Sequence, residues 1–200
     1  MNMQLGTMHA ASFVTDPKHL GFVLARYKFV AKMLTGYGRV LEIGCGDCTG
    51  AAIVNAVVGD WRGFDRDHDL LNFARTVDPA RLQFFDITSG PFGGEWDACY
   101  ALDVLEHISP DGENAVLRNI TECMTPQGVL IIGMPSKESQ SYASELSRLH
   151  HVNCKTEAEL RETMLRHFHN VFIFGMNDET LHTGYGPMCH YRLAIGVGKR

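Results

Sequence analysis

The stretch Val40-Leu41-Glu42-Ile43-Gly44-Cys45-Gly46-Asp47-Cys48-Thr49-Gly50 decides the fold that we expect. It begins with a short apolar run, residues 39–43, that is typical of a buried strand and leads directly into glycines. Glycine permits a tight turn and lets a ligand approach the main chain. The amides of such a turn, and those at the start of a following helix, can hold polar or anionic groups. The stretch therefore predicts a strand, a ligand-binding turn and a helix, although an ordinary strand-to-helix turn has the same glycines.

Strands and helices alternate on both sides of this turn. The periodicity predicts helices over residues 17–34, 50–58, 67–76, 113–124 and 156–168, and further strands over 61–64, 82–85, 97–102, 129–134, 171–175 and 191–197. This alternation favours an α/β fold with a doubly wound, mostly parallel sheet between two helical layers. The last two strands have no helix between them, which indicates a hairpin. We therefore expect a Rossmann-like, three-layer sheet of seven strands with an antiparallel C-terminal strand.

Length and composition are those of an ordinary globular protein. The chain has 200 residues, of which 45% are apolar and 20% charged, so we expect a single domain. Within it we expect an N-terminal helical cap over residues 1–35, a cofactor-binding core over 36–135 and a substrate-side part over 136–200. The six cysteines are scattered along the chain and are expected to be reduced thiols.

Charge and hydropathy narrow the partners. A net charge of −5 repels phosphate backbones, so we expect no nucleic-acid partner. The sequence contains no apolar run of about 18 residues and no charged leader followed by an apolar segment, so we expect no membrane association and a cytoplasmic location. A homodimer formed through exposed faces of the first predicted helix stays open.

Acidic residues stand at or near the ends of the first three predicted strands. Asp65 follows the glycine turn by about 20 residues, where a carboxylate can accept both hydroxyls of a ribose. Asp86 ends the third strand, where it can face an adenine amino group, although either aspartate also suits a helix N-cap. Glu42 interrupts an apolar strand and therefore needs a partner, either backbone amides of the turn or a cation.

These segments resemble the successive motifs of class I S-adenosylmethionine-dependent methyltransferases. The resemblance rests on residues 40–50, Gly63-Phe64-Asp65, Phe85-Asp86-Ile87 and Asp103-Val104-Leu105-Glu106-His107, and it covers residues 36–135, with the final hairpin agreeing in order. It implies S-adenosylmethionine as cofactor and S-adenosylhomocysteine as product. The first motif would hold the methionine end, Asp65 the ribose, and Asp86 with Ile87 the adenine, while Leu102 and Asp103 would line the cleft toward the substrate. The cofactor-binding residues so implied are Glu42, Gly44, Cys45, Gly46, Asp65, Arg66, Asp86, Ile87, Leu102 and Asp103.

One position departs from the family, and other interpretations of the turn exist. Cys48 stands where the family often has a third glycine, and it fits if its side chain points away from the cofactor. A nicotinamide-dependent oxidoreductase is the rival on a related sheet, but its fingerprint needs a glycine where Thr49 stands. Cys45 and Cys48 have the spacing of a metal or redox pair, yet no second such pair accompanies them.

The acceptor side is expected in the histidine-rich C-terminal third. A hydroxyl acceptor must lose a proton during methyl transfer, and histidine titrates near neutral pH. We take His107, after the fourth strand, and His182 and His190, near the last loop, as candidate catalytic residues. The polar segment 177–190 is expected to form part of the acceptor pocket, although a solvated loop would have the same composition. The candidate substrate-binding residues are His151, Asn177, Asp178 and Tyr185.

A metal site from His151, Asp178, His182 and His190 is an alternative, because imidazole and carboxylate suit several divalent ions. Their spacing does not demand one, so we assign no metal. No Asn/Asp-Pro-Pro-Tyr segment and no basic tail is present, which favours a small acceptor. The function that we expect is methyl transfer to a small polar metabolite, at oxygen in preference to nitrogen. The alternatives are a non-catalytic S-adenosylmethionine-binding module and an NAD-dependent oxidoreductase.

Overall fold

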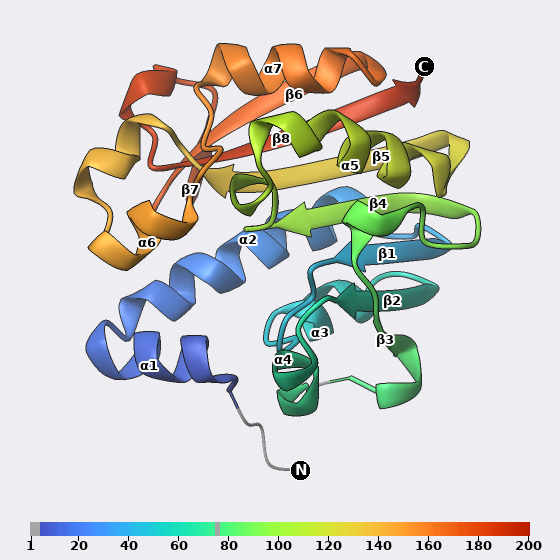
Figure 1. Cartoon of the computed structure of the whole chain (residues 1–200), viewed down its shortest axis with the longest axis horizontal. Helices are drawn as coiled ribbons and strands as arrows, with labels where there is room; N and C mark the ends of the chain where they lie inside the picture. Colours follow the sequence, from blue (N-terminus) through green and yellow to red (C-terminus); the bar gives the residue numbers. More distant parts are fainter. Residues whose placement is uncertain (1–4, 75–76) are drawn as a thin grey trace. The chain divides into compact units, whose positions relative to one another are not determined.

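Figure 1 shows the protein as a computed structural model, which describes residues 5–74 and 77–200. The chain forms two compact parts, an N-terminal part that ends at Asp86 and a C-terminal part that begins at Ile87. Each part combines β-strands with helices. Among the residues that the structure describes, no helix has both the length and the apolar content needed to cross a bilayer.

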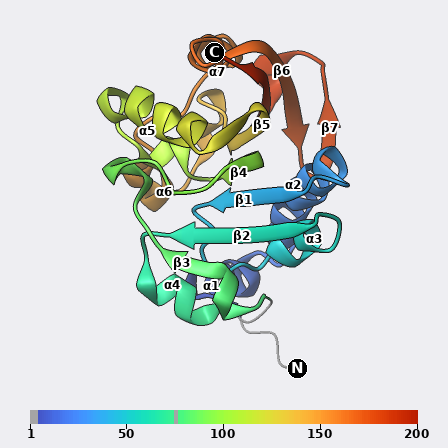
Figure 2. The same cartoon turned by 90° about the vertical axis from the view of Figure 1, so that its right-hand side faces the viewer.

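Three parallel strands form the sheet of the N-terminal part. Strand β1 (Arg39–Ile43) pairs with β2 (Asp60–Asp65), which pairs with β3 (Leu82–Phe84); Figure 2 shows the three side by side. The helices of this part are α1 (Thr7–Thr15), α2 (Lys18–Leu34), α3 (Ala51–Asn55), α4 (His68–Phe73) and the 3₁₀ turn η1 (Pro79–Arg81). Because the strands are parallel, the residues that follow β1 and β2 leave the sheet at the same edge.

The core of this part follows from the apolar patterns. Val40, Leu41 and Ile43 of β1 are at most 1% exposed, and Trp61 of β2 is fully buried. Continuous apolar runs are what a strand covered on both faces requires. Helix α2 adds a buried face that includes Leu34. The strands that carry the glycine turn and Asp65 are therefore held by a packed core.

Five strands form the sheet of the C-terminal part, in the order β4-β5-β8-β6-β7. Strands β4 (Trp96–Leu102) and β5 (Met124–Pro135) are parallel. Strand β8 (Tyr191–Lys199) runs antiparallel to both β5 and β6 (Phe168–Asn177), and the short β7 (Thr180–His182) runs antiparallel to β6. The helices of this part are α5 (Pro110–Glu122), α6 (Glu145–His150) and α7 (Glu157–Leu165), with 3₁₀ turns η2 (Ile87–Ser89), η3 (Leu105–His107), η4 (Glu138–Tyr142) and η5 (Gly186–Met188).

The predicted α/β class and the antiparallel C-terminal strand are confirmed. The described residues form eight strands instead of seven, because β7 lies in the polar segment that we expected to be a loop. The segment Pro126-Gln127-Gly128, whose composition is typical of a turn, lies inside β5. There the register moves from Trp96 opposite Met124 to Ala98 opposite Val129. A single strand can absorb such extra residues as a bulge.

Element boundaries agree best where a local signal sets them. Strand β1 has the predicted bounds, and Thr156 and Glu159 form the capping box that their spacing suggests. Helix α3 is shorter than expected. The helix expected over 67–76 ends at Phe73, and residues 75–76 lie outside the described residues. Helices α1 and α6 were not predicted; Leu146 and Leu149 of α6 are more than half exposed, so this helix lacks the buried face on which periodicity depends.

A substitution at Gly50 tests whether the glycine turn depends on close packing against Tyr27. A Cβ added there would overlap the ring of Tyr27, whereas a Cβ at Gly93 would meet no atom within 4 Å. Overpacking a well-filled site costs about 1–3 kcal/mol. We expect Gly50→Ala to lower the free energy of unfolding by that amount in urea titrations, and Gly93→Ala to change it by less than about 0.5 kcal/mol. Equal stabilities of the two variants would contradict the packing described for Tyr27.

Candidate functional site

The glycine turn after β1 uses left-handed backbone at three residues. Gly44, Gly46 and Cys48 have φ values of 70°, 53° and 57°, a region that glycine enters without steric cost. The amides of Gly44 and Cys45 donate to the carbonyl oxygen of Phe64 at 2.9 and 3.0 Å, which ties the turn to β2. A Cβ placed at Gly46 would meet nothing within 4 Å. The turn thus leaves open space beside its main chain, which is the feature that a bound nucleoside needs.

Asp65 links the glycine turn to the start of α4. One of its carboxylate oxygens accepts a hydrogen bond from the Gly46 amide and the other from the Asp67 amide, both at 2.8 Å. Each carboxylate oxygen has two lone pairs, so each keeps one for a further donor. The structure therefore places a carboxylate with remaining acceptor capacity at the turn, as the ribose role of Asp65 requires.

Glu42 is buried within β1, at 1% exposure. Its carboxylate accepts a hydrogen bond from the hydroxyl of Tyr27, on α2, at 2.8 Å. A buried carboxylate without such donors would be strongly destabilising. Tyr27, which the sequence did not single out, therefore helps to keep an acidic residue inside the strand that leads into the turn.

Cys45 and Cys48 are buried thiols. A hydrogen bond to Cys48, burial, and the negative charges of Glu42 and Asp65 raise the pKa of the Cys45 thiol. A reactive or metal-binding cysteine needs the thiolate form, so Cys45 is poorly suited to either role. The left-handed φ of Cys48 also gives the physical reason for the glycine that the family often has at this position.

Asp47 ties the N-terminal helix to the glycine turn, a contact that the sequence did not reveal. Its carboxylate accepts hydrogen bonds from the Gly6 amide at 2.5 Å and from His9 Nδ1 at 3.0 Å, and from the Thr49 amide and hydroxyl at 3.0 and 2.6 Å. Burial opposes ionisation, but the bonds from His9 and Thr49 prevail and lower the pKa of Asp47 to about 2. Through this contact, His9 anchors α1 to the glycine turn.

Two further predicted cofactor residues complete the N-terminal part. Arg66, directly after β2, is exposed, and Asp86, two residues beyond β3, is half-buried. Arg66 follows β2, which pairs directly with β1, and Asp86 follows β3, which pairs with β2; all three strands are parallel. The acidic residues that were expected after β2 and β3 therefore lie at the strand ends, and their roles toward the cofactor stay predictions.

The remaining predicted cofactor residues belong to the C-terminal part. Ile87 is buried in η2, where its carbonyl oxygen accepts a hydrogen bond from Asn119 Nδ2 at 2.8 Å. Leu102, the last residue of β4, is buried. Asp103 follows it with a φ of 57°, and its amide donates to the carbonyl oxygen of Gly133 at 2.9 Å. A non-glycine residue in this region costs free energy and is often found at functional sites.

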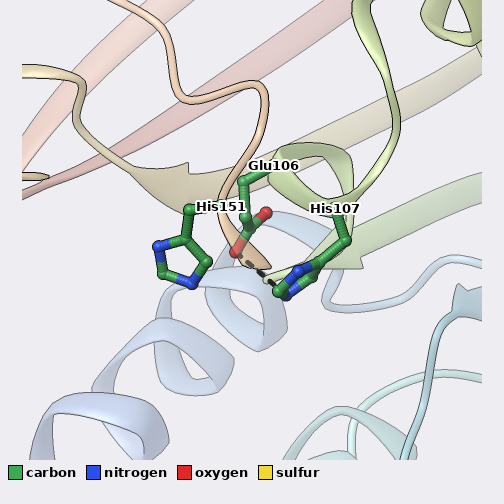
Figure 3. Close-up of side chains that lie close together, drawn as sticks. All are labelled: Glu106, His107 and His151. Carbon is green, nitrogen blue, oxygen red and sulfur yellow. Dashed lines mark ion pairs between the residues drawn. The ribbon is translucent and has the colours of Figure 1, made fainter. Parts of the chain in front are cut away.

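Glu106, His107 and His151 form a compact cluster (Figure 3), called here the Glu106 cluster. One ligand-type atom from each residue lies within 4.8 Å of the others. Glu106 is fully buried, His107 is exposed and His151 is half-buried. His107 Nε2 lies 3.9 Å from Glu106 Oε1, and the two imidazole rings are 5.2 Å apart at 67°. Glu106 was quoted only as part of a motif, so the sequence missed it as a site residue.

A set of buried polar contacts brings His151 to this cluster. The Asn153 amide donates to the carbonyl oxygen of Glu106 at 3.0 Å. Asn153 Nδ2 donates to a Glu113 carboxylate oxygen of α5 at 2.8 Å, and Lys155 pairs with the same oxygen at 2.7 Å. Both charged side chains are largely buried, and removing one partner of such a pair is strongly destabilising. The loop after α6 is therefore anchored at Asn153 and at Lys155.

The cluster also shapes the ionisation of its neighbours. Burial and the nearby His107 lower the pKa of His151, against the opposing effect of Asp103. Burial and the negative charges of Glu106 and Asp103 raise the pKa of the Cys154 thiol to about 12. This shift favours the neutral imidazole of His151, the form in which one ring nitrogen keeps a lone pair.

His182 and Asn177, both predicted, are in contact within the β6–β7 hairpin. His182 Nε2 lies 3.0 Å from Asn177 Oδ1, and His182 Nδ1 accepts the Gly184 amide at 3.1 Å. Asn177 Nδ2 donates to the carbonyl oxygen of Met188 at 3.2 Å. Since Nδ1 accepts, Nε2 carries the proton and donates to the amide oxygen. Both ring nitrogens of His182 are therefore engaged in holding the hairpin.

The other residues predicted in this segment lie at exposed or half-buried positions. Asp178 and Tyr185 are exposed, and Asp178 occupies a tight turn with a φ of 50°. His190 is half-buried, and its carbonyl oxygen accepts the Ser136 amide at 2.9 Å. Within residues 5–74 and 77–200, His151, Asp178, His182 and His190 are not grouped closely enough to share an ion. The structure instead brings His151 to His107.

Sequence comparison identifies the family. Residues 20–170 match a family model described as a methyltransferase domain, and the chain belongs to that family. No curated protein matches the chain. The protein is an S-adenosylmethionine-dependent methyltransferase, in agreement with the glycine turn, the strand-end carboxylates and the sheet order of each part. An NAD-dependent oxidoreductase and a non-catalytic module are therefore set aside.

Solved structures show the same fold. The chain is similar to a methyltransferase from Thermotoga maritima described as a possible histamine N-methyltransferase, with a TM-score of 0.73, 17% identity and coverage of 96% of this chain and 95% of that one. It is also similar to a magnesium protoporphyrin IX methyltransferase from Synechocystis with bound S-adenosylmethionine. Here the TM-score is 0.61 and the identity 16%, with 90% of this chain and 78% of that one covered. For an N-methyltransferase from Bradyrhizobium japonicum in complex with S-adenosyl-L-homocysteine, the TM-score is 0.63 and the identity 14%. The match covers 90% of this chain and 86% of that one.

The bonds around Asp47 predict an acid-sensitive contribution to stability. A carboxyl whose pKa is lowered from 3.8 to about 2 on folding stabilises the fold by about 2 kcal/mol above pH 4, and this is lost as the pH falls toward 2. We expect the difference in unfolding free energy between wild type and Asp47→Asn to shrink over that range in urea titrations. His9→Ala should move the loss to a higher pH. A difference that does not change with pH would show that these bonds contribute no ionic stabilisation.

Proposed function

We propose that this methyltransferase acts on a small polar metabolite and methylates oxygen in preference to nitrogen. The observation that carries the proposal is the Glu106 cluster, in which two imidazoles stand beside a buried carboxylate. Such a group can orient a hydroxyl and accept its proton. Overall, the acceptor would lose one proton and gain one methyl group, and the sulfonium of the donor would become the neutral thioether of S-adenosylhomocysteine.

The residues of the N-terminal part are proposed to bind the donor. When bound, S-adenosylmethionine supplies a methyl group activated by the positive sulfur. The free lone pairs of Asp65 would accept the ribose hydroxyls, and the open space beside Gly46 would admit the nucleoside. Glu42, Gly44, Cys45 and Arg66 would complete the turn around the methionine end, and Asp86 would contact the adenine. In the C-terminal part, Ile87 would contact the adenine, and Leu102 with Asp103 would line the cleft toward the substrate, as the family resemblance implies.

Among the three candidate bases, His107 is the best suited. Its Nδ1 faces the carbonyl oxygen of His150 at 3.1 Å, and since a carbonyl only accepts, Nδ1 carries the proton. Nε2 of the neutral ring therefore keeps a lone pair, and the ring is exposed to an incoming molecule. His182 would have to give up a hairpin bond to act as a base. His190 is half-buried, and it stays a candidate together with Asn177, Asp178 and Tyr185 as acceptor contacts.

The class of acceptor is argued from charge and from the kind of group present. A net charge of −5 disfavours a nucleic-acid acceptor. Two related structures carry descriptions of N-methyltransferases, one of them as a possibility, but those acceptors are known only for those proteins. Oxygen is favoured here because a hydroxyl needs a base at neutral pH and the cluster offers one. Cytoplasmic location and a homodimer stay predictions.

Donor binding is tested by calorimetry with S-adenosylhomocysteine, which does not react. We expect Asp65→Ala to weaken its binding by about tenfold or more, because hydrogen bonds to a charged group contribute about 1.5–3 kcal/mol. Asp60→Asn changes a carboxylate at the other end of β2 and serves as the control. Equal affinities of wild type and Asp65→Ala would contradict the proposed ribose contact.

Acceptor chemistry is tested with labelled S-adenosylmethionine and matched panels of small hydroxylated and amine compounds. We expect turnover with hydroxyl acceptors, and a loss of about 10²–10⁴-fold in kcat for His107→Gln, the usual contribution of general base catalysis. Affinity for S-adenosylhomocysteine should not change in that variant. Turnover confined to amines would overturn the preference for oxygen, and an unchanged kcat would remove His107 from the chemistry.

A further inference from the structure

We propose that the Glu106 cluster is a binding site for a divalent first-row transition metal ion, held by Glu106, His107 and His151. Two imidazoles and one carboxylate are ligands that zinc, manganese, iron and cobalt accept in proteins. The three groups come from η3 and from the residue that follows α6. Figure 3 shows the two rings on either side of the Glu106 carboxylate. The metal would be additional to S-adenosylmethionine, and it differs from the ion site considered from the sequence.

The orientation of both imidazoles supports a ligand role. His107 Nδ1 faces the carbonyl oxygen of His150 at 3.1 Å, and His151 Nδ1 faces the amide oxygen of Gln140 at 3.0 Å. Both oxygens can only accept a hydrogen bond, so each Nδ1 carries the ring proton and each Nε2 keeps its lone pair. Metal-binding histidines typically donate their other ring N–H to such an acceptor, which fixes the tautomer and the ring orientation. The same arrangement occurs here twice.

The distances are compatible with one shared ion after a small closure. The three ligand atoms lie within 4.8 Å of one another, and His107 Nε2 is 3.9 Å from Glu106 Oε1. Ligands at about 2.0–2.2 Å from a tetrahedral ion stand roughly 3.3 Å apart. Closing the remaining gap requires side-chain shifts of about an ångström. His107 is exposed and can make them without moving the buried Glu106.

Rigid support distinguishes this cluster from a chance grouping of surface residues. Glu106 is fully buried, and the main chain of η3 is tied to Asn153 by a 3.0 Å hydrogen bond. Asn153 is held in turn by Glu113 and Lys155. Sites whose ligands are positioned by buried contacts lose less freedom on binding. The Glu106 carboxylate and the loop that carries His151 are therefore positioned before an ion arrives, and His107 supplies the closure.

Three protein ligands leave at least one position on the ion open, as in catalytic metal sites. On the proposed function, on which this assignment of a role rests, that position would receive the acceptor oxygen. A bound cation polarises a hydroxyl and eases transfer of its proton to solvent water, while the oxygen gains the methyl group and the donor sulfur becomes a thioether. His107 would then act as a ligand and not as the base. If the ion expands to five ligands, as catalytic zinc sites can, it could hold both oxygens of an acceptor that has a hydroxyl beside a second oxygen.

Metal binding is tested on tag-free full-length protein after treatment with a chelator. Co²⁺ is the probe, because its visible absorption reports coordination, and Zn²⁺ is measured by calorimetry. We expect one ion per chain for the wild type. Metal binding should weaken at least tenfold in each of the three ligand variants, Glu106→Gln, His107→Gln and His151→Gln. Gln140→Ala should weaken it by about 10–100-fold, the usual effect of removing a residue that hydrogen-bonds to a metal ligand. His169→Gln, which changes an exposed histidine of β6, should bind like the wild type.

Folding is controlled in each variant by circular dichroism and by its affinity for S-adenosylhomocysteine. Should Glu106→Gln fail to fold, His151→Gln at a half-buried position still decides the case. Absence of a one-to-one Co²⁺ spectrum, or equal affinities of His151→Gln and His169→Gln, would overturn the metal site. If methylation of hydroxyls persisted without added metal, the role of the metal in catalysis would be overturned and the proposed function would still hold. Metal binding without hydroxyl methylation would instead overturn the proposed acceptor.

Discussion

The carboxylate of Asp65 accepts the amides of Gly46 and Asp67, and the N-terminal part is organised around this pair of bonds. They join the turn after β1 to the segment after β2, so the two strand ends share one polar centre. The turn needs left-handed backbone at three positions, and charge-assisted bonds to a carboxylate are strong enough to hold it. The residue proposed to bind the ribose is thus also the residue that shapes the turn.

A second constraint of the same kind governs the C-terminal part. Glu113 accepts from Asn153 and pairs with Lys155, and Asn153 bonds to the main chain at Glu106. These buried contacts hold the loop after α6 against η3. Together with the bond from His151 to Gln140, they keep His151 beside His107. The chemistry proposed for the acceptor therefore depends on a polar network that never touches it.

The two parts differ in how general their features are. The glycine turn and the strand-end carboxylates match the motifs of the methyltransferase family, and they are the residues proposed to bind the donor. The Glu106 cluster joins a motif residue pair to a histidine from a distant loop, and this addition is what points to a particular acceptor chemistry. The fixed Nδ1–H groups matter most, because they decide which nitrogen of each ring is left for a proton or an ion.

Strand β1, the capping box at Thr156 and the antiparallel C-terminal strand could be predicted from sequence, because periodicity and capping act within a few residues. The family motifs likewise indicated the donor and the place of Asp65. Tertiary structure alone decided that His9 and Gly6 meet Asp47, and that His151 joins Glu106 and His107. It also decided that part of segment 177–190 forms a hairpin in which His182 and Asn177 bond to each other. Contacts between residues about 40 positions apart leave no period or local signal in the sequence, since they arise only when packed elements bring distant loops together.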